Sequence, residues 1–322
     1  MNVLITSASR KVALVRAFRS AVGAVGGGEV YAGDISRHSP ALFVADHAVI
    51  MPRSGSADFV DWLARFCKQH EIGLVVPTRD EELPLFARHA QAFLARGTRI
   101  AVSPAPTIAL CQDKSGFFQF CAAKGFAAPR VLQPADIGAR DYPVFVKPSR
   151  GKGGRGAARA DDATSLSMAI DSIDAPIVQE FCDLPEYTLD VFADFDGRVV
   201  SVVPRERIVL VGGESYVSRT RRDRILINRG RELAENIGLV GHGTIQCFYG
   251  GEEPKFIEIN PRYGGAANLG FAAGHHTPEY LVRLTTGQSL APMLGEFDDG
   301  LTMLRFTEDM FLTAEEMRGS FS

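Results

Sequence analysis

The first hundred residues alternate short apolar runs with longer amphipathic stretches. We expect strands at residues 3–6, 30–33, 47–51, 74–77 and 99–102. We expect helices at residues 10–22, 59–70 and 81–95. In the first helix, Val12, Val15 and Phe18 recur at helical spacing and are candidate core residues. Short strands that alternate with helices of this length are typical of a parallel sheet covered on both faces.

Loops at the carboxyl ends of these strands are the first candidate positions for a ligand, because open parallel sheets bind ligands at that edge. The loops at 6–10, 34–37 and 78–82 would lie there. The third loop is the most polar, with the sequence Thr-Arg-Asp-Glu-Glu. From these residues, contact with a substrate amine and contact with another domain are equally plausible.

The pattern changes after residue 112. Asp113 is the expected N-cap of a helix at 114–124, and Gly125 is its expected end. Beyond it, we expect strands at residues 144–147, 156–159, 177–181, 188–193 and 199–203. Helices are expected again at residues 229–237 and 277–286. Because the new strands follow one another without long helices between them, they favour antiparallel pairing, and we place a domain boundary near residue 112.

Composition narrows the classes of protein that fit. The chain has 322 residues, 46% of them hydrophobic, enough for a sizeable core in two or three domains. Its net charge of −3 gives no general reason to expect a nucleic-acid partner. The five cysteines are never in a CxxC pair, which indicates reduced thiols rather than disulfides or structural zinc. The N-terminus lacks the charge order of a signal peptide and no apolar run is of membrane-spanning length, so we expect a cytoplasmic protein.

A glycine-rich basic segment, Ser-Arg-Gly-Lys-Gly-Gly-Arg-Gly, follows the strand expected at 144–147. Gly151, Gly153 and Gly156 formally satisfy GxGxxG, but no helix is expected directly after them, as a dinucleotide site requires. The segment instead predicts a hairpin loop, with Lys147 on its entering strand, that folds over a polyphosphate. A solvated basic turn is an equally weighted alternative.

A second hairpin places oxygen donors on one face. The strands Thr-Ile-Gln-Cys-Phe and Phe-Ile-Glu-Ile-Asn-Pro-Arg flank the turn residues 250–254. If the hairpin is symmetric, Gln246 lies opposite Glu258 and Thr244 lies opposite Asn260, on one face. The apolar reverse face would then hold Ile245, Cys247, Ile257 and Ile259. One carboxylate with two amide carbonyls suits Mg²⁺ bound together with phosphates and water, whereas a half-exposed hairpin is the plainer interpretation.

The run Ile-Val-Gln-Glu-Phe-Cys at 177–182 leads through a polar hinge to Glu186. Such a hinge can present backbone groups to a base and the carboxylate of Glu186 to a ribose. From these residues alone, an ordinary strand and turn is the favoured interpretation.

An arginine-rich stretch extends from residue 205 to residue 222. Guanidinium groups bind carboxylates with two parallel hydrogen bonds, so some of these side chains are candidates to hold a substrate carboxylate. We single out Arg205, Arg207 and Arg219, with a solvated basic loop as the equally weighted alternative.

Together, these motifs resemble the ATP-grasp superfamily, most closely the large-subunit halves of carbamoyl-phosphate synthetase and small stand-alone amino-acid ligases. The resemblance covers nearly the whole chain and rests on PVFVKPSRGKGGRG, VQEFCDLPEYTLDV and GTIQCF…KFIEINPR, in this order. It implies an α/β protein whose N-terminal Rossmann-like domain (residues 1–112) precedes an ATP-grasp domain (residues 113–322). The latter would be α+β with two antiparallel-sheet subdomains, a lid at 113–182 and a core with the metal site at 183–322.

The resemblance also implies residue roles, with ATP and Mg²⁺ as cofactors and Mn²⁺ as an alternative metal. The phosphates would be bound by Lys114, Lys147, Gly153 and Gly154. The base and ribose would be bound by Gln179, Glu180, Phe181, Cys182 and Glu186. The metal would be bound by Gln246, Glu258 and Asn260. Lys147 and Arg262 would be catalytic, with Arg262 stabilising the phosphoryl and acyl-phosphate oxygens. Most of the superfamily has Glu where Gln246 stands, although the carbamoyl-phosphate synthetases resemble this chain in having Gln.

The expected activity is that of an ADP-forming carboxylate–amine ligase, which activates a small carboxylate as an acyl phosphate for attack by an amine. Phosphorylation of bicarbonate or carbamate, as in carbamoyl-phosphate synthetase, is one alternative. A non-catalytic nucleotide-binding protein is another. We expect small-molecule substrates, no nucleic-acid or membrane partner, and leave open assembly as a homodimer.

Overall fold

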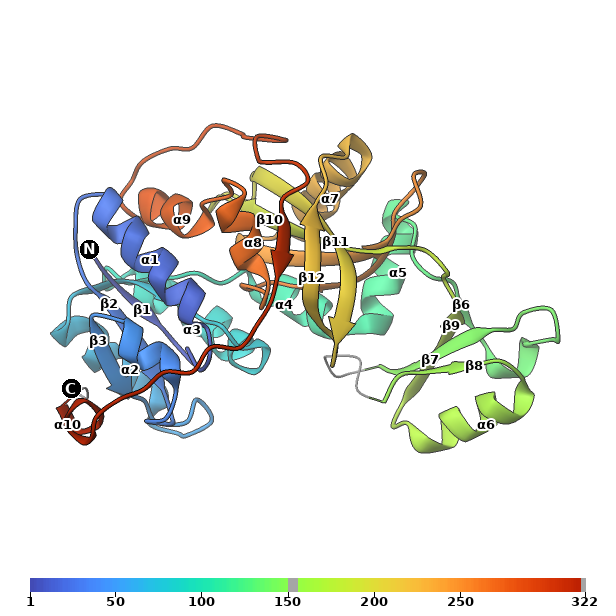
Figure 1. Ribbon diagram of the computed structural model, residues 1–322, viewed down its shortest axis with the longest axis horizontal. Coiled ribbons are helices and arrows are strands. Elements are labelled where there is room, and N and C mark those ends of the chain that lie inside the picture. Colours follow the sequence, from blue (N-terminus) through green and yellow to red (C-terminus); the bar gives the residue numbers. More distant parts are fainter. Residues whose placement is uncertain (150–155, 320–322) are drawn as a thin grey trace.

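The computed structural model describes residues 1–149 and 156–319, and three sheets organise the chain (Figure 1). A parallel sheet forms the N-terminal domain, a large antiparallel sheet occupies the middle of the molecule, and a small antiparallel sheet lies at the far end. The expected fold class, an α/β N-terminal domain followed by two antiparallel-sheet units, is confirmed.

The N-terminal sheet has five parallel strands in the order β3-β2-β1-β4-β5. Its strands are β1 (Asn2–Ile5), β2 (Val30–Asp34), β3 (His47–Ile50), β4 (Ile72–Val76) and β5 (Arg99–Ile100). The connecting helices are α1 (Val12–Ala24), α2 (Phe59–Gln69) and α3 (Leu83–Leu94), with short 3₁₀ turns η1 (Pro40–Val44) and η2 (Asp80–Glu82). The polar loop expected at 78–82 therefore contains η2, at the carboxyl end of β4.

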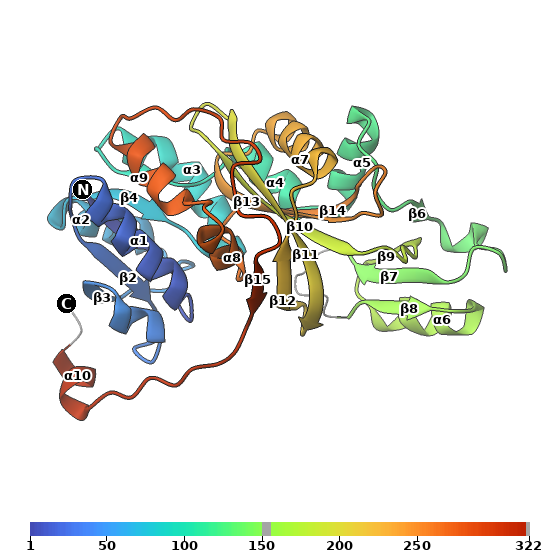
Figure 2. The same cartoon turned by 45° about the horizontal axis from the view of Figure 1, so that its top comes forward.

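Both faces of the parallel sheet are buried, as the continuous apolar strands predict. Val75 packs with α2 and α3, through residues such as Phe59 and Phe86. On the opposite face, Ile5 shares a core with α1 and with Tyr280 of α9 (Thr277–Thr285). This second core includes residues from both ends of the chain, so the N-terminal domain packs directly on the C-terminal part (Figure 2).

The middle sheet has six antiparallel strands in the order β14-β13-β10-β11-β12-β15. They are β10 (Glu186–Ala193), β11 (Val199–Val211), β12 (Glu214–Thr220), β13 (Gly241–Phe248), β14 (Lys255–Asn260) and β15 (Thr302–Leu304). Its apolar face packs on α5 (Lys114–Lys124) and α7 (Arg224–Ile237). Two further helices, α4 (Ala105–Gln112) and α8 (Ala267–Ala272), contact β14 and β12 of this sheet. The last helix, α10 (Ala314–Gly319), lies away from the sheet, below the N-terminal domain in Figures 1 and 2.

The small sheet has four antiparallel strands in the order β6-β9-β7-β8. They are β6 (Val131–Leu132), β7 (Val144–Pro148), β8 (Ala158–Ala160) and β9 (Pro176–Glu180), with the turn η3 (Pro134–Asp136) between β6 and β7. One face packs on α6 (Ala163–Ser172) in a separate core, so this unit is held to the rest of the molecule mainly through its two ends.

Capping residues explain two helix boundaries. Asp113 accepts a hydrogen bond from the backbone of Ser115 and Gly125 is left-handed, so α5 has the expected bounds. Asp223 likewise accepts from the first turn of α7, which therefore begins at Arg224, earlier than the expected residue 229. The proposed domain boundary at residue 112 coincides with the end of α4 and stays a prediction.

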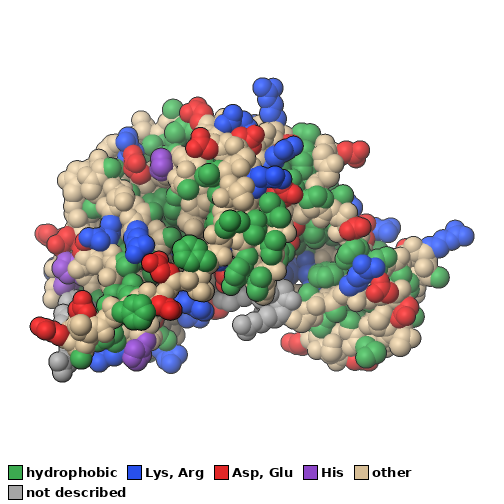
Figure 3. Space-filling view, in the orientation of Figure 1, with side chains coloured by type: hydrophobic (Ala, Val, Ile, Leu, Met, Phe, Trp, Pro, Cys, Tyr) green, Lys and Arg blue, Asp and Glu red, His purple; other side chains and the backbone are tan. Residues whose placement is uncertain are grey.

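Two surface features complete the description. Hydrophobic side chains gather over β11, β12 and β15, where Leu304 and Phe306 are 71% and 79% exposed (Figure 3). Across residues 1–149 and 156–319, no helix combines the length and apolar character needed to cross a bilayer.

Candidate active site

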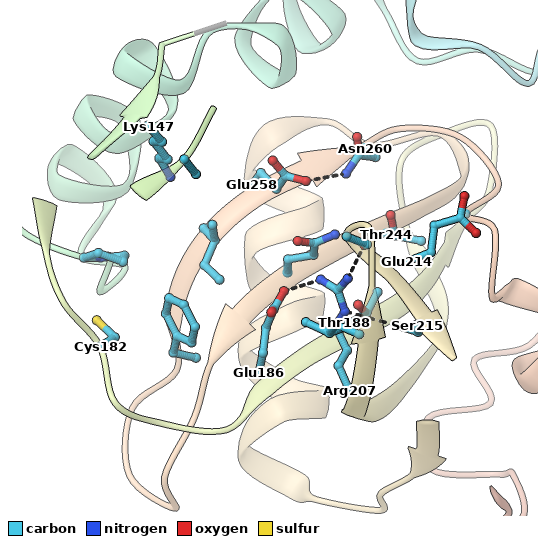
Figure 4. Close-up of a pocket in the computed structure, with 18 of the residues that line it drawn as sticks. Lys147, Cys182, Glu186, Thr188, Arg207, Glu214, Ser215, Thr244, Glu258 and Asn260 are labelled. Carbon is cyan, nitrogen blue, oxygen red and sulfur yellow. Dashed lines mark hydrogen bonds and ion pairs between the residues drawn. The ribbon is translucent and has the colours of Figure 1, made fainter. Parts of the chain in front are cut away.

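A cavity of about 890 Å³ is lined by residues of the small sheet and of the six-stranded sheet. Lys147 and Gln179 come from the small sheet, Glu258 and Asn260 from β14, and Glu214 from β12 (Figure 4). All of the predicted nucleotide and metal residues within the described ranges border this space. Gly153 and Gly154 lie outside the described residues.

The β13–β14 hairpin has the predicted register where it borders the cavity. Gln246 pairs with Glu258, and Thr244 pairs with Asn260. Ile245 and Ile259, on the reverse face, are fully buried in the core with α5 and α7. The alternation of side chains along the two strands thus gathers the oxygen donors on the cavity face.

One part of the hairpin prediction is wrong. A β-bulge shifts the pairing between Gln246 and Cys247, so that Cys247 pairs with Phe256. Phe256 is consequently buried in the core, whereas Ile257, predicted on the apolar reverse face, lines the cavity beside Glu258. A bulge inserts one residue into one strand, and the side chains on its two sides lose strict alternation.

The donor set fits a magnesium ion. Glu258 supplies one carboxylate, and its Oε1 accepts a hydrogen bond from Asn260 Nδ2 at 3.0 Å, which holds the two side chains together. Gln246 adds an amide oxygen from the neighbouring strand. Mg²⁺ is usually held by one or two carboxylates and completed by phosphates and water. Among the described residues there is no group of three or more His, Cys, Asp and Glu side chains that would favour a transition metal.

Lys147 faces the β13–β14 hairpin from the small sheet (Figure 4). Its side chain is buried, and its ammonium lies 4.8 Å from the centroid of the Phe118 ring. Burial lowers the pKa of Lys147 to about 8, against the opposing effect of the Glu258 charge. Lys114, the second predicted phosphate ligand, donates to the carbonyl of Pro148 at 3.4 Å and also borders the cavity.

The predicted hinge follows β9 along the cavity wall. Gln179 is 2% exposed, and Phe181 and Cys182 border the same space. Glu180 forms an ion pair with Lys255 at 2.5 Å. Glu180 is therefore already paired within the protein, whereas the backbone from Glu180 to Cys182 runs along the cavity.

Glu186 and Arg207, predicted for ribose and for carboxylate recognition, form an ion pair with each other. Tyr187 pairs with Glu206 in the sheet, which brings the side chains of Glu186 and Arg207 together on neighbouring strands. Arg207 also donates to Ser215 Oγ at 3.1 Å. Burial raises the pKa of Glu186, while the charge of Arg207 opposes that shift.

The three arginines predicted to bind a substrate carboxylate differ in position. Arg205 and Arg207 line the cavity, but Arg219 does not. Glu206 and Arg219 pair directly across β11 and β12, on the face opposite Arg205 and Arg207, and form an exposed ion pair at 2.8 Å. Side chains alternate between the two faces of β11 and β12, so Arg219 lies on the other face from Arg205 and Arg207 and cannot reach the cavity with them.

Arg205 is itself part of a buried ion pair. Its Nε donates to Asp190 Oδ2 at 2.9 Å, and both side chains are less than 5% exposed. His242 and His275, behind this pair, are fully enclosed, and burial lowers the pKa of His275 to about 3. Both histidines are buried core residues, and their ring centroids lie 6.2 Å apart.

Arg262 follows β14 and borders the cavity. Its Nε and Nη2 donate to the two carboxylate oxygens of Asp80 at 3.0 Å and 2.8 Å. Asp80 belongs to η2 of the N-terminal domain, so the polar loop at 78–82 makes the domain contact that was one of its two expected roles.

Several cavity residues were not predicted. Thr188, Glu214, Ser215 and Arg305 border the cavity. Arg305 donates to Glu214 at 2.7 Å and to the carbonyl of Gly265 at 2.5 Å. Its position depends on the pairing of β15 with β12, distant in sequence, and no local pattern indicates that pairing.

Two family models match the chain. A PylC-like N-terminal domain matches residues 3–101, and a model described as "ATP-grasp in the biosynthetic pathway with Ter operon" matches residues 172–308. The carbamoyl phosphate synthase large chain of Campylobacter jejuni is 29% identical over 231 residues, which is 64% of this chain and 21% of that protein. The chain thus spans about a fifth of the length of this relative.

Two solved structures show the same fold at low sequence identity. The biotin carboxylase domain of Hydrogenobacter thermophilus 2-oxoglutarate carboxylase, a dimer in complex with MgADP and bicarbonate, has a TM-score of 0.71 at 17% identity. The match covers 94% of this chain and 73% of that one. The L-amino acid ligase from Bacillus licheniformis has a TM-score of 0.68 at 18% identity, over 94% of this chain and 78% of that one.

The two family matches fall on the parallel sheet and on the six-stranded sheet with its flanking elements. Residues 3–101 are therefore similar to a PylC-like N-terminal domain, and residues 172–308 are similar to an ATP-grasp domain.

Proposed function

We propose that this protein is an ATP- and Mg²⁺-dependent ligase that forms ADP and joins a small carboxylate to an amine through an acyl phosphate. The observation that carries the proposal is the face of the β13–β14 hairpin. There Glu258, Asn260 and Gln246 meet at one place, with Lys147 across the cavity. A nucleotide-binding protein without catalysis would not require a metal carboxylate and a buried lysine at the same site.

The nucleotide would lie along β9 and the hinge, with its phosphates between Lys114, Lys147 and the hairpin. Glu258, Asn260 and Gln246 would hold Mg²⁺, which supplies charge neutralisation at the phosphate oxygens. Attack by the substrate carboxylate on the terminal phosphorus would break its bond to ADP and form the acyl phosphate. An amine then attacks the acyl carbon, and phosphate leaves.

The residues of this chain would supply binding and orientation more than proton transfer. Phosphoryl transfer to a carboxylate depends mainly on in-line positioning and on neutralising charge. Arg262 would stabilise the transferring oxygens from the end of β14. Arg205 and Arg207 would border the substrate end of the cavity, although each is paired with a carboxylate of the protein.

The test is ADP release across a panel of carboxylates and amines, with hydroxylamine as a trapping nucleophile. The proposal expects ADP, not AMP, and a hydroxamate when ATP and the right carboxylate are present. AMP and pyrophosphate as products would refute it. The same assay separates a second candidate, phosphorylation of bicarbonate, which the similarity to carbamoyl phosphate synthase favours. In that case bicarbonate alone would stimulate ADP release.

A further inference from the structure

The contact between Arg262 and Asp80 joins the two parts of the molecule at the active site. Arg262 lies two residues beyond Asn260 at the end of the metal hairpin. Asp80 lies in the N-terminal domain, at the carboxyl end of the parallel sheet. The two side chains are 18% and 20% exposed, so the pair is shielded from most of the solvent. Their geometry is that of a two-point arginine–carboxylate pair, which fixes orientation as well as distance.

The hydrogen bonds of Arg262 leave little of its guanidinium free. Its Nε and one Nη2 hydrogen are donated to Asp80, and Nη2 also donates to Asn260 Oδ1 at 3.3 Å. Nη1 donates to the carbonyl of Tyr263 at 3.3 Å. A guanidinium has five N–H groups, so one hydrogen of Nη1 remains without a partner among the described residues. These contacts thus leave one Nη1 hydrogen as the part of Arg262 that can bind a ligand.

Asp80 is itself held in place from two directions. Its backbone carbonyl accepts a hydrogen bond from Gln112 Nε2 at 2.7 Å. In the same turn, Glu82 accepts from Ser7 Oγ at 2.5 Å and from Thr6 Oγ1 at 3.2 Å, and is buried. None of these partners belongs to the small sheet, so the turn that carries Asp80 is held independently of that sheet.

The surroundings of Arg262 explain why a carboxylate is needed there. Lys11 lies nearby, and its pKa is lowered to about 8 by burial and then by the charge of Arg262. Without Asp80, the guanidinium would face the positive charge of Lys11 with no carboxylate paired to it. The carboxylate of Asp80 balances that repulsion and keeps Arg262 directed toward Asn260.

We infer that Asp80 is a positioning residue for Arg262, through which the N-terminal domain sets the orientation of a catalytic side chain in the ATP-grasp site. The inference rests on the proposed function and extends it. Asp80 touches neither nucleotide nor metal in this arrangement, since the cavity lining does not include it. Its effect on the reaction is exerted through the one N–H that Arg262 offers to the transferring phosphoryl group.

The test compares wild type with Asp80→Asn, which keeps the shape of the side chain but removes its charge. The probe is MgADP with and without aluminium fluoride, which mimics a transferring phosphoryl group. In wild type, fluoride should tighten MgADP binding. In Asp80→Asn, MgADP alone should bind as in wild type, whereas the tightening should fall by about 10- to 100-fold, the scale of misplacing a catalytic group. Arg262→Lys should also lose the fluoride-dependent tightening of MgADP binding. Asp80→Glu should recover part of that tightening.

Two comparisons separate positioning from a merely structural contact. Glu279→Gln breaks a similar ion pair, Arg283 to Glu279 at 2.7 Å on α9, and should leave the tightening unchanged. If the contact were structural alone, Asp80→Asn would lower the melting temperature without affecting the fluoride-dependent tightening. That result, or full tightening in a folded Asp80→Asn, would overturn the inference. A wild-type protein that does not bind MgADP would overturn the proposed function and this inference with it.

Discussion

Replacing Glu258 with glutamine tests the metal hairpin most directly. Glu258 is half-buried and faces the cavity, and it accepts a hydrogen bond from Asn260 Nδ2. The amide carbonyl of glutamine can accept the same bond, and no core volume is lost. The free energy of unfolding should therefore change by about 0.5 kcal/mol or less, as for substitutions that leave the core intact.

The effect on turnover should be much larger. Glu258 is the one carboxylate of the proposed donor set, and the loss of a charged metal ligand removes several kcal/mol of transition-state stabilisation. At about 1.4 kcal/mol per factor of ten, a loss of ~3 kcal/mol lowers kcat by about 10²-fold. Gln246→Ala should reduce kcat less, because a neutral amide contributes less than a carboxylate to holding a dication.

The measurements are ADP release at saturating MgATP and thermal unfolding without nucleotide. Glu258→Gln and Gln246→Ala are made together, so that the charged and neutral donors are compared on the same strands. Wild-type turnover in Glu258→Gln would refute the assignment of the hairpin as the metal site. A large fall in the melting temperature would instead show that Glu258 acts in the fold.

Four further predictions concern binding, stability and pH. MgATP should raise the melting temperature more than NAD does, and the reverse order would revive a dinucleotide site. Asp190→Asn should lower the free energy of unfolding by about 3–5 kcal/mol, because it leaves the buried charge of Arg205 unpaired, and urea denaturation measures this. Arg219→Ala should leave the KM of the carboxylate unchanged, since Arg219 lies outside the cavity lining; a raised KM would restore it as a substrate contact. The pKa of His275 is about 3 in the folded protein and near 6.5 in the unfolded chain. The unfolded chain therefore binds a proton below pH 6.5 that the folded protein does not bind, and the free energy of unfolding falls as the pH drops below 6.5. The free energy of unfolding should fall by about 2 kcal/mol between pH 7 and pH 5. Equal midpoints of urea unfolding at pH 7 and pH 5 would contradict this prediction.

The sequence was most informative where a local pattern determines the structure. Apolar runs and their spacing predicted the parallel sheet, and residue alternation predicted that Gln246 and Glu258 share a face. Both features depend on periodicity within one segment or across one short turn. Asp113 and Gly125 predicted the bounds of α5 for the same reason, because capping depends on adjacent residues.

The sequence was least informative where distant segments meet. Nothing near Glu186 indicates that Arg207 neutralises it, and nothing near Arg262 selects Asp80 from among the acidic residues of the loop at 78–82. Such pairs depend on how whole sheets pack. The bulge beside Cys247 is a different case, since the adjacent apolar residues Phe256 and Ile257 break the alternation but do not indicate which of the two faces the core.

The bulge separates the residue that lines the cavity from the residue that fills the core behind it. In a regular hairpin, a residue next to Glu258 would be buried against α5 and α7, and any change in its size would disturb their packing. Here Phe256 fills that core, whereas Ile257 borders the cavity and is half-buried. Position 257 can therefore change in size or polarity during evolution, or in a designed library, and alter which ligands the cavity accepts while the scaffold beneath it stays the same.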